Sequence, residues 1–561
     1  MSSALCVICG APAPLKCSAC KSVAYCAKEH QKQHWKTHKT ACRPFEVDTS
    51  PELGRHLVAT RDVAADAVLL TEAPLVAGPR HHDNPRGPCL GCLQPLPADV
   101  AADAQAMCPG CLWPACSADC PGLRDALSHL AECRVLQAGR HVVLQDDLRY
   151  DALLPLRCLL LQKTSPAKWR TLQAMDANMA ARGPGTLVHQ ETQDRVVTYL
   201  RENFLRPLSV IMSGSRATPD RVEGLLEDCS ESTLHRIVGV LDVNALEISS
   251  GLTDISALYP TAYLMEHSCV PNTRHSFTRS ASSEEHDARF RITLRSATDI
   301  KKGEHISTMY THMLWGTMAR REHLLAVKGF PCRCRRCADP RELGSLLSAL
   351  RCLACGAGNL LPSDPLDDNA DWRCDACGAP LAAEHVIQVV SSLDEQVGQA
   401  MEGAGGADAL EGTVAKLEKL LHPHHYHCLQ VKHSLLQLYG GQLEMSRLSA
   451  QQLQRKASLS REVLGVLLQL DPPLARLQLY AAVCLLELQR ADLEALKRAQ
   501  GEAGTGTAAN TRAALQDMRA LLQRATHALR FETADEGARM VDAIKTAQQE
   551  MEVWARVNKV A

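Results

Sequence analysis

Aromatic residues make up only 4% of this 561-residue chain, too few for a nucleic-acid surface built on base stacking. Neither sign of charge dominates: 61 Lys and Arg residues face 63 Asp and Glu residues for a net charge of -2, which argues against a globally basic, phosphate-tracking protein. No apolar run approaches the roughly 18 residues of a membrane helix. The first residues, MSSALCVICG, lack the basic and apolar segments of a secretory signal. We therefore expect no membrane span, no direct sequence-specific nucleic-acid binding, and a location in the nucleus and cytoplasm.

Cysteine and histidine, in contrast, are abundant, with 25 and 23 residues, and many cysteines stand in C-x-x-C pairs. Disulfide scaffolds are typical of short secreted chains, and this chain is long and starts without a secretory pattern. The composition therefore favours zinc bound in a reducing compartment.

Residues 6–42 contain four pairs of potential zinc ligands. They are Cys6 and Cys9, Cys17 and Cys20, Cys26 and His30, and His38 and Cys42. The C-x2-C spacing lets one turn supply two thiolates, and the spacings that include histidine place two ligands on one face of a helix. A unit this small cannot fold on hydrophobic burial alone, so the spacing predicts a finger folded by two zinc ions.

Residues 89–133 repeat this order of ligands with longer gaps. The repeated positions are Cys89, Cys92, Cys108, Cys111, Cys116, Cys120, His129 and Cys133. Buried free thiols would not give four pairs in the same order. The repeat therefore predicts a second zinc finger of the same type.

Two further zinc sites are expected in the second half of the chain. The first takes Cys332, Cys334 and Cys337 of GFPCRCRRC, with Cys269 of MEHSCVPNT as the best fourth ligand. The second is a ribbon with the spacing C-x2-C-x18-C-x2-C, formed by Cys352, Cys355, Cys374 and Cys377. The four modules together imply about six zinc ions in closed sites, which disfavours metal-assisted hydrolysis. The remaining thiols, expected in the core, are Cys158, Cys229, Cys428 and Cys484.

Hydrophobic periodicity predicts an α+β fold for the rest of the chain. Residues 53–78 contain two β-prone runs around a charged turn, which suggests a β-hairpin. Residues 146–238 are mostly helical by pattern, and residues 240–310 return to short strands. From about residue 385 to 561 one helix follows another, which suggests paired antiparallel helices like a TPR array, without a strict repeat.

Several motifs in order identify the chain as resembling the SET-domain protein-lysine methyltransferases. They are LDVNALEISS, ALYPTAYLMEHSCVPNT, KKGEHISTMY and GFPCRCRRC. Together with a finger that resembles the MYND finger, they are similar to the SMYD (SET and MYND) family, and the additional finger resembles its SmydA branch. The resemblance implies a split SET-domain β core with zinc fingers and an all-helical TPR-like C-terminal domain.

The resemblance also implies a division into domains. These are the first MYND finger at 6–42, the first part of SET at 50–80, the second finger at 89–133, a helical insert at 146–238, core SET at 239–312, a post-SET zinc site at 313–338, a ribbon at 350–380 and the helical domain at 385–561. MYND fingers recruit proteins, so we expect protein substrates or partners that bind through the fingers and the helical tail, such as proline-rich peptides or corepressors.

If the resemblance extends to activity, the cofactor is S-adenosylmethionine and the reaction is methyl transfer to lysine. The family's catalytic tyrosine then corresponds to Tyr310. The implied cofactor-binding residues are Arg55, Asn244, Glu266, His267 and Phe330.

Three positions depart from the family pattern. His56 replaces a glycine of the G-x-G turn, Glu266 replaces an asparagine, and Lys328 replaces a second tyrosine. Two functions therefore stay open: a methyltransferase with an altered site, and a SET-fold scaffold or corepressor adaptor with weak or no catalysis. Because Glu266 and Lys328 have opposite charges, we also expect them to form a pair in the space that the chemistry needs.

Overall fold

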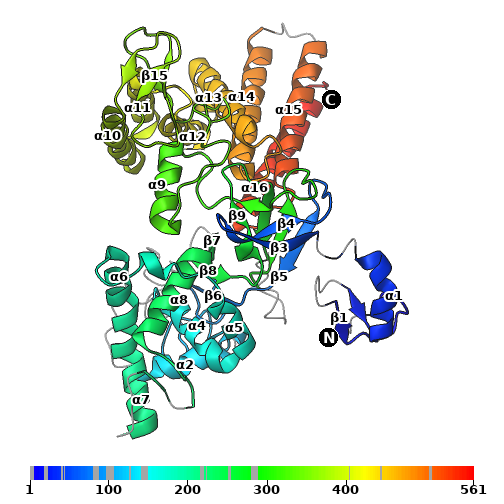
Figure 1. Cartoon of the computed structure of the whole chain (residues 1–561). Coiled ribbons are helices and arrows are strands. Elements are labelled where there is room, and N and C mark those ends of the chain that lie inside the picture. Colours follow the sequence, from blue (N-terminus) through cyan, green and yellow to red (C-terminus); the bar gives the residue numbers. More distant parts are fainter. Residues whose placement is uncertain are drawn as a thin grey trace.

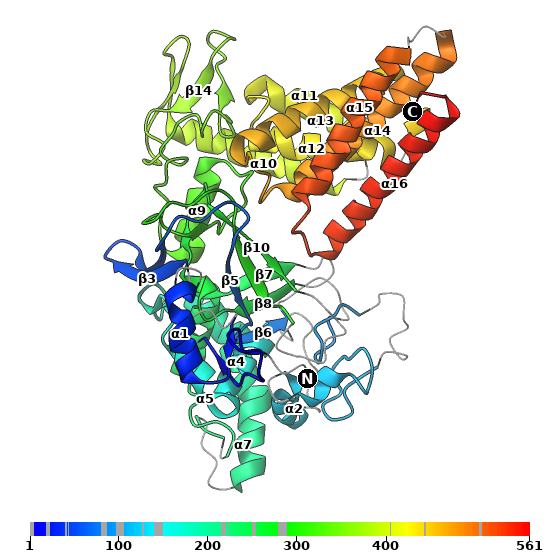
Figure 2. The ribbon, with the colours of Figure 1, turned by 90° about the vertical axis from the view of Figure 1, so that its right-hand side faces the viewer.

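The computed structural model is an α+β protein with small sheets at its centre, one helical unit below them and a longer helical half above (Figures 1 and 2). The residues described are 5–17, 23–39, 42, 44–79, 87–96, 106–125, 128–139, 150–214, 220–222, 224–249, 254–278, 289–403, 405–441, 445–503 and 508–560. Within these ranges, every helix is too short or too polar to cross a membrane.

The first finger lies at the edge of the molecule, beyond the strands that follow it (Figure 1). Its elements are β1 (Leu15–Lys16), β2 (Ala24–Tyr25) and α1 (Lys28–His38). The two strands pair in antiparallel fashion. Tyr25 is fully buried, and its hydroxyl lies 2.9 Å from His34 Nδ1. Apart from this ring the interior consists mostly of the potential ligands, as expected for a unit folded by metal.

The central core brings distant segments into small sheets. Strands β3 (Phe45–Ser50) and β4 (Gly54–Ala59) form an antiparallel pair. A second sheet has the order β10 (Thr273–Phe277), β11 (Ile292–Ser296), β5 (Val68–Glu72). A third has the order β6 (Val76–Pro79), β8 (Asp254–Leu258), β7 (Leu246–Ser249). The short strands β9 (Glu266–His267) and β12 (Ser307–Thr308) pair in parallel.

The β-hairpin expected within residues 53–78 is wrong. Strand β4 pairs instead with the preceding strand β3, around a turn in which Gly54 adopts a φ of 63° that favours glycine. Strand β5 pairs with β11, where Leu70 faces Leu294. Ile292 and Leu294 are fully buried in the core that β5 helps to close. Local patterning located these strands but could not find a partner so far along the chain.

The unit below the core combines the second finger with a helical insert. Its helices are η2 (Pro121–Arg124), α2 (His129–Ala138), α4 (Leu153–Thr164), α5 (Pro166–Gln173), η3 (Met179–Ala181), α6 (Leu187–Thr192), the π-helices η4 (Gln193–Thr198) and η5 (Arg201–Leu205), α7 (Arg206–Ser213) and α8 (Glu231–Asn244). Every residue from Leu153 to Leu161 is buried, so α4 is the central helix of this unit. Ser230 caps α8 by accepting a hydrogen bond from the backbone N–H of Thr233.

The upper half begins with α9 (Thr317–Lys328) and a four-stranded ribbon. The ribbon strands are β13 (Leu350–Arg351), β14 (Asn359–Pro362), β15 (Trp372–Cys374) and β16 (Pro380–Leu381). One short helix, η7 (Ala262–Leu264), belongs to the core instead. The helices that follow are α10 (Ala383–Glu402), α11 (Gly406–Leu420), α12 (Tyr426–Gly441), η9 (Met445–Arg447), α13 (Ala450–Leu470), α14 (Gln478–Ala503), α15 (Ala508–Ala528) and α16 (Asp535–Val557). Successive helices from α10 to α16 pack on one another, so the predicted helical C-terminal region is confirmed (Figure 2).

Two lysines are fully buried between these helices. Lys432 Nζ lies 2.7 Å from Glu418 Oε1 and 2.5 Å from Glu462 Oε1. Lys456 Nζ lies 2.5 Å from Glu487 Oε2 and donates to the carbonyl of Leu436 at 2.6 Å. Each ammonium thus has carboxylate and carbonyl partners, without which burial of the charge would be strongly destabilising.

Histidines in the same region make stability depend on pH. Burial lowers the pKa of His422 and of His433 to about 4, below the ordinary value of 6.5. The unfolded chain binds these protons more readily, so their contribution to the free energy of unfolding is complete above pH 6.5 and is lost as the pH falls toward 4. Since both residues are half-buried, we expect a loss of roughly 1–2 kcal/mol for each, measured by urea unfolding between about pH 7.5 and 5.

The matched variant is His433→Phe, which keeps a ring against Tyr480, 4.7 Å away, and removes the titration. Its free energy of unfolding should fall less steeply with acid than that of the wild type. Zinc release at low pH acts on both proteins, so the difference between their slopes isolates the histidine. Equal slopes would contradict this origin of the pH dependence.

Candidate metal centres and the cavity beside Tyr310

The ligand pairs of the first finger come together in an interleaved order. Cys6 and Cys9 meet Cys26 and His30, and their ligand atoms all lie within 4.8 Å of one another. Cys26 Sγ is 3.5 Å from Cys9 Sγ and 3.1 Å from His30 Nδ1. The first turn of α1 therefore supplies the histidine, at a position where the MYND pattern usually has cysteine.

The second half of the same finger involves the remaining pairs. Cys17 Sγ lies 3.4 Å from Cys42 Sγ, and His38 is buried in the last turn of α1. Cys20, the fourth predicted ligand, lies outside the described residues.

The second finger has the same interleaving. Its two groups are Cys89, Cys92, Cys116 and Cys120, and then Cys108, Cys111, His129 and Cys133. His129 Nε2 lies 3.4 Å from Cys111 Sγ. Hydrogen bonds from Cys111 and His129 lower the pKa of the Cys133 thiol to about 3, which suits a thiolate ligand.

The two later groups also assemble as the sequence predicts. They are Cys269, Cys332, Cys334 and Cys337, and Cys352, Cys355, Cys374 and Cys377. Five clusters of four sulfur or nitrogen donors have the composition and closeness that tetrahedral zinc requires, so the residues present fit zinc and would hold it as structural ions.

A buried carboxylate orients the histidine of the second finger. Glu132 is completely buried and its Oε1 lies 2.8 Å from His129 Nδ1. Arg157 of α4 donates to both carboxylate oxygens at 2.7 Å. The same guanidinium donates to the carbonyls of Ala77 at 2.9 Å and Leu90 at 2.8 Å. The chain from His129 through Glu132 to Arg157 therefore connects the finger to strand β6 and to the helical insert.

A second buried arginine lies behind the cluster that contains Cys269. Arg320 Nε donates toward Cys269 Sγ at 3.3 Å, and its Nη2 lies 3.6 Å from Cys337 Sγ. Its Nη1 donates to Glu342 Oε2 at 2.8 Å, and Arg336 reaches the same oxygen at 3.3 Å. These guanidinium groups offset the negative charge of a buried thiolate cluster.

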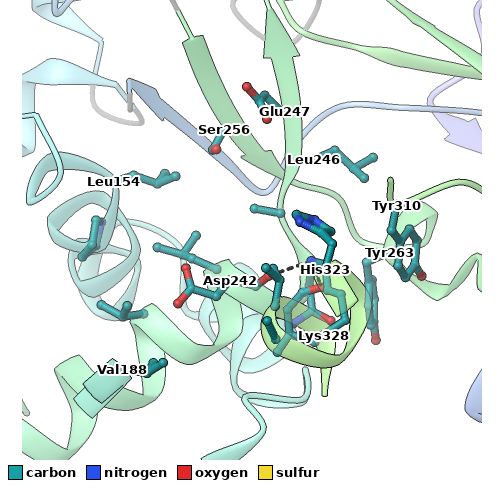
Figure 3. A pocket seen from close by; sticks show the side chains of 18 of the residues that line it. Leu154, Val188, Asp242, Leu246, Glu247, Ser256, Tyr263, Tyr310, His323 and Lys328 are labelled. Carbon is teal, nitrogen blue, oxygen red and sulfur yellow. Dashed lines mark hydrogen bonds between the residues drawn. The ribbon is translucent and has the colours of Figure 1, made fainter. Parts of the chain in front are cut away.

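A cavity of about 860 Å³ lies between the helical insert, the core and the helical C-terminal half (Figure 3). Of the six residues predicted for cofactor binding and catalysis, Asn244 and Tyr310 line it. Its lining does not include Arg55, Glu266, His267 or Phe330. Two of the six predicted residues therefore line the cavity, and the other four do not.

Tyr310 stands at the centre of the predicted site. Its hydroxyl donates to the carbonyl of Met265, and its backbone N–H donates to His267 Nδ1 at 3.1 Å. The His267 ring lies 5.2 Å from the Tyr310 ring and 6.0 Å from the Phe330 ring. Burial and the charge of Glu266 raise the pKa of Tyr310, while burial lowers the pKa of His267 to about 4. Both groups are therefore neutral near pH 7.

The expected pairing between Glu266 and Lys328 is wrong, because each side chain has another partner. Glu266 Oε2 lies 2.8 Å from His305 Nδ1. Lys328 Nζ donates to the carbonyls of Asp242 at 2.7 Å and Val243 at 2.9 Å, in the last turn of α8 (Figure 3). These carbonyls end a helix, where a cation is favoured by both hydrogen bonding and the helix dipole. Lys328 Nζ also lies 5.6 Å from the centre of the Tyr310 ring.

Two side chains that the resemblance assigns to S-adenosylmethionine already have partners within the protein. The side-chain amide of Asn244 donates to the carbonyls of Asp176 at 2.7 Å and Val240 at 2.8 Å. Arg55 Nη2 donates to the carbonyl of Ala174 at 2.7 Å.

The altered turn also has contacts within the protein. His56 is buried, and its ring lies 4.6 Å from the His305 ring that holds Glu266. The polar groups that the resemblance assigns to the cofactor are thus engaged within the protein itself.

Several cavity residues were not found from the sequence. Arg182 and Arg195 come from the insert, His275 and His323 from the core and α9, and Arg476 from the loop before α14. None belongs to a local motif, so only the meeting of three separate units could reveal them.

The fold and the clusters define a zinc-finger protein in which a helical insert divides the β core. A family model for the MYND finger matches residues 6–42. SET domain-containing protein SmydA-8, isoform B, of Drosophila melanogaster is 30% identical over 342 residues, which cover 59% of this chain and 66% of the relative. A SET and MYND domain-containing protein of Dictyostelium discoideum is 24% identical over 334 residues, covering 54% of this chain and 61% of the relative. N-lysine methyltransferase SMYD2-A of Xenopus laevis is 30% identical over 92 residues, 16% of this chain and 19% of the relative.

The chain is similar to proteins of the SET and MYND (SMYD) family. It spans just under two thirds of the length of the fly relative, at 66%.

The buried arginine of the second finger gives a test of its coupling to the fold. Arg157→Met leaves the Glu132 carboxylate buried without its guanidinium, so the free energy of unfolding should fall by about 3–5 kcal/mol. We also expect faster loss of zinc to a chelator, from a wild-type content of about six ions measured by elemental analysis.

Arg124→Met is the matched control, because Arg124 lies in the same finger but forms an exposed ion pair with Asp119. Its stability should stay within about 0.5 kcal/mol of the wild type. Equal stability of the two variants would show that the buried carboxylate does not depend on Arg157.

Proposed function

We propose that this chain is a partner-recruiting zinc protein built on a SET fold, with weak or absent methyl transfer. The observation that carries the proposal is the position of Lys328. Its ammonium is held at the end of α8 and faces the Tyr310 ring, where the family pattern has a second tyrosine. A methyl-transfer site instead needs a neutral lysine amine beside a sulfonium.

The Lys328 ammonium would repel a sulfonium or a protonated substrate lysine strongly enough to weaken binding or slow methyl transfer. At an effective dielectric constant near 20, two like charges about 4 Å apart repel by about 4 kcal/mol. That energy corresponds to roughly a thousandfold in rate or in binding. The carbonyl partners of Lys328 reduce the repulsion, but they do not replace the missing tyrosine hydroxyl.

The first finger supports the recruiting role through its surface. Val7 and Ile8, which lie between two ligands, are 48% and 36% exposed, and Trp35 of α1 is 41% exposed. In the second finger the residue in the corresponding place, Leu90, is fully buried. Exposed apolar side chains on a rigid finger suit peptide binding, whereas the second finger is part of the core.

A protein-lysine methyltransferase is the second candidate, and the placement of Tyr310 favours it. Tyr310 and Tyr263 line one end of the cavity beside α9, and the hydroxyl of Tyr310 bonds the carbonyl of Met265. Tyrosine rings and carbonyls can orient a lysine amine without adding positive charge. The name of the Xenopus relative points the same way. In this function S-adenosylmethionine would supply the methyl group, after the side chains now engaged within the protein rearrange.

Titration with S-adenosylmethionine separates the two functions. We expect weak or no binding by the wild type, and tighter binding with detectable methyl transfer for Lys328→Tyr, alone and with Glu266→Asn. Because the carbonyl partners of Lys328 already reduce the repulsion, the gain should stay below the roughly 10³-fold limit set by charge repulsion. Calorimetry and transfer of a labelled methyl group are the measurements.

Lys302→Tyr is the control, because Lys302 is exposed and lies away from the cavity. It should leave binding unchanged. Strong methyl transfer by the wild type that Lys328→Tyr reduces would reject the recruiting function and establish the enzyme.

The finger surface can be tested with an array of synthetic proline-rich peptides. Trp35→Ala should weaken binding at least about tenfold, because it removes a large apolar contact. Lys36→Ala, on the same helix, should bind as the wild type does. The zinc content of both variants must equal that of the wild type. Unchanged binding by Trp35→Ala would place the peptide surface elsewhere.

A further inference from the structure

Arg476 stands where the helical C-terminal half meets the core. It lies just before α14, and its Nη1 donates to Thr308 Oγ1 at 3.1 Å and toward the carbonyl of Thr273 at 3.4 Å. Within the described part of the chain, no carboxylate forms an ion pair with it. The nearby Asp471 accepts hydrogen bonds from the backbone N–H groups of Arg476 and Leu477, at 2.7 and 2.9 Å.

The other cations on the wall of the large cavity already have partners within the protein. Arg182 lies 2.8 Å from Asp242, and Arg195 lies 2.7 Å from Asp151. Lys328 caps the end of α8, as described above. Among the described residues of this wall, Arg476 is therefore the guanidinium that forms no ion pair with a carboxylate.

A smaller cavity of about 240 Å³ lies on the other side of this arginine. Arg476 and His275 line both cavities, so they form part of the wall between them. Three buried polar atoms that line the smaller one have no partner in the described chain: Arg274 Nε, His275 Nδ1 and Gln478 Oε1. Unpartnered polar atoms around a cavity indicate a place where a polar ligand or water completes the hydrogen bonds.

The smaller cavity has charges of both signs. Arg274 shares the single carboxylate of Asp66 with Arg530. Glu532 lines the cavity too, and it accepts a hydrogen bond from Gln478 Nε2 at 2.9 Å. Because Glu532 repels anions, a singly charged carboxylate is favoured over a doubly charged phosphate beside Arg476.

Burial lowers the pKa of Arg476 to about 10, and Asp471 partly offsets this effect. The guanidinium is thus still charged at neutral pH. A half-buried cation that forms no ion pair is incompletely compensated, and an anion supplied by a partner adds the missing counter-charge.

We propose that Arg476 binds a carboxylate of a partner peptide that lies in the large cavity. The proposal rests on the recruiting function above and names the chemistry of one partner: an acidic side chain or a free carboxyl terminus. Arg476 sets specificity here, since an uncharged peptide would leave the guanidinium unpaired.

Selection of a random peptide phage library on the full-length, zinc-loaded chain tests this proposal. The selected peptides should share an Asp or Glu at one position, or end in a free carboxylate. The best peptide and its matched amide, with Glu→Gln or an amidated terminus, are then titrated by fluorescence anisotropy. The wild type should prefer the carboxylate form by at least about tenfold.

The variants complete a double-mutant cycle. Arg476→Gln should bind the acid and amide peptides equally, Arg476→Lys should keep part of the preference, and Arg524→Gln, exposed on α15, should behave as the wild type does. Melting curves and zinc content establish that each variant is folded.

Three results would overturn the proposal: no enriched peptide, enrichment without a carboxylate, or an acid preference that persists in Arg476→Gln. This readout needs neither S-adenosylmethionine nor the first finger. Its failure is therefore distinct from a failure of the recruiting function, which the finger variants test.

Discussion

Four thiolates around a zinc ion carry excess negative charge, which nearby cations and N–H donors stabilise in a protein interior. Arg320 is such a cation behind one cluster and is itself paired with Glu342. In the second finger the cation is reached through a chain of hydrogen bonds, from His129 to Glu132 and from Glu132 to Arg157. Each guanidinium also donates to carbonyls of neighbouring segments. The metal centres therefore fix the positions of the surrounding strands and helices, which a core of short sheets could not do alone.

The two fingers show how one ligand pattern serves two purposes. In the first, the residues between ligands face solvent, and the finger lies at the edge of the molecule (Figure 1). In the second, Leu90 is fully buried and its carbonyl accepts from Arg157. The ligand pattern is shared by both fingers, whereas the surroundings decide whether the residues between the ligands are exposed or buried.

The departures from the family pattern are connected in space. The His56 ring lies 4.6 Å from the His305 ring, and His305 contacts Glu266, so two departures far apart in the sequence meet at one place. Lys328 is stabilised separately by the end of α8. The three departing side chains therefore have partners within the protein itself.

The sequence by itself determined the metal-ligand groups, because spacing along a short segment dictates which side chains can share an ion. It also determined the helical C-terminal half, whose periodicity is local. Only the tertiary structure decided the pairing of β5 with β11, the separate partners of Glu266 and Lys328, and the place of Arg476 on the cavity wall. The reason is physical: strand pairing and buried charge depend on groups that are distant in the chain, and their energies are set by which surfaces exclude water together.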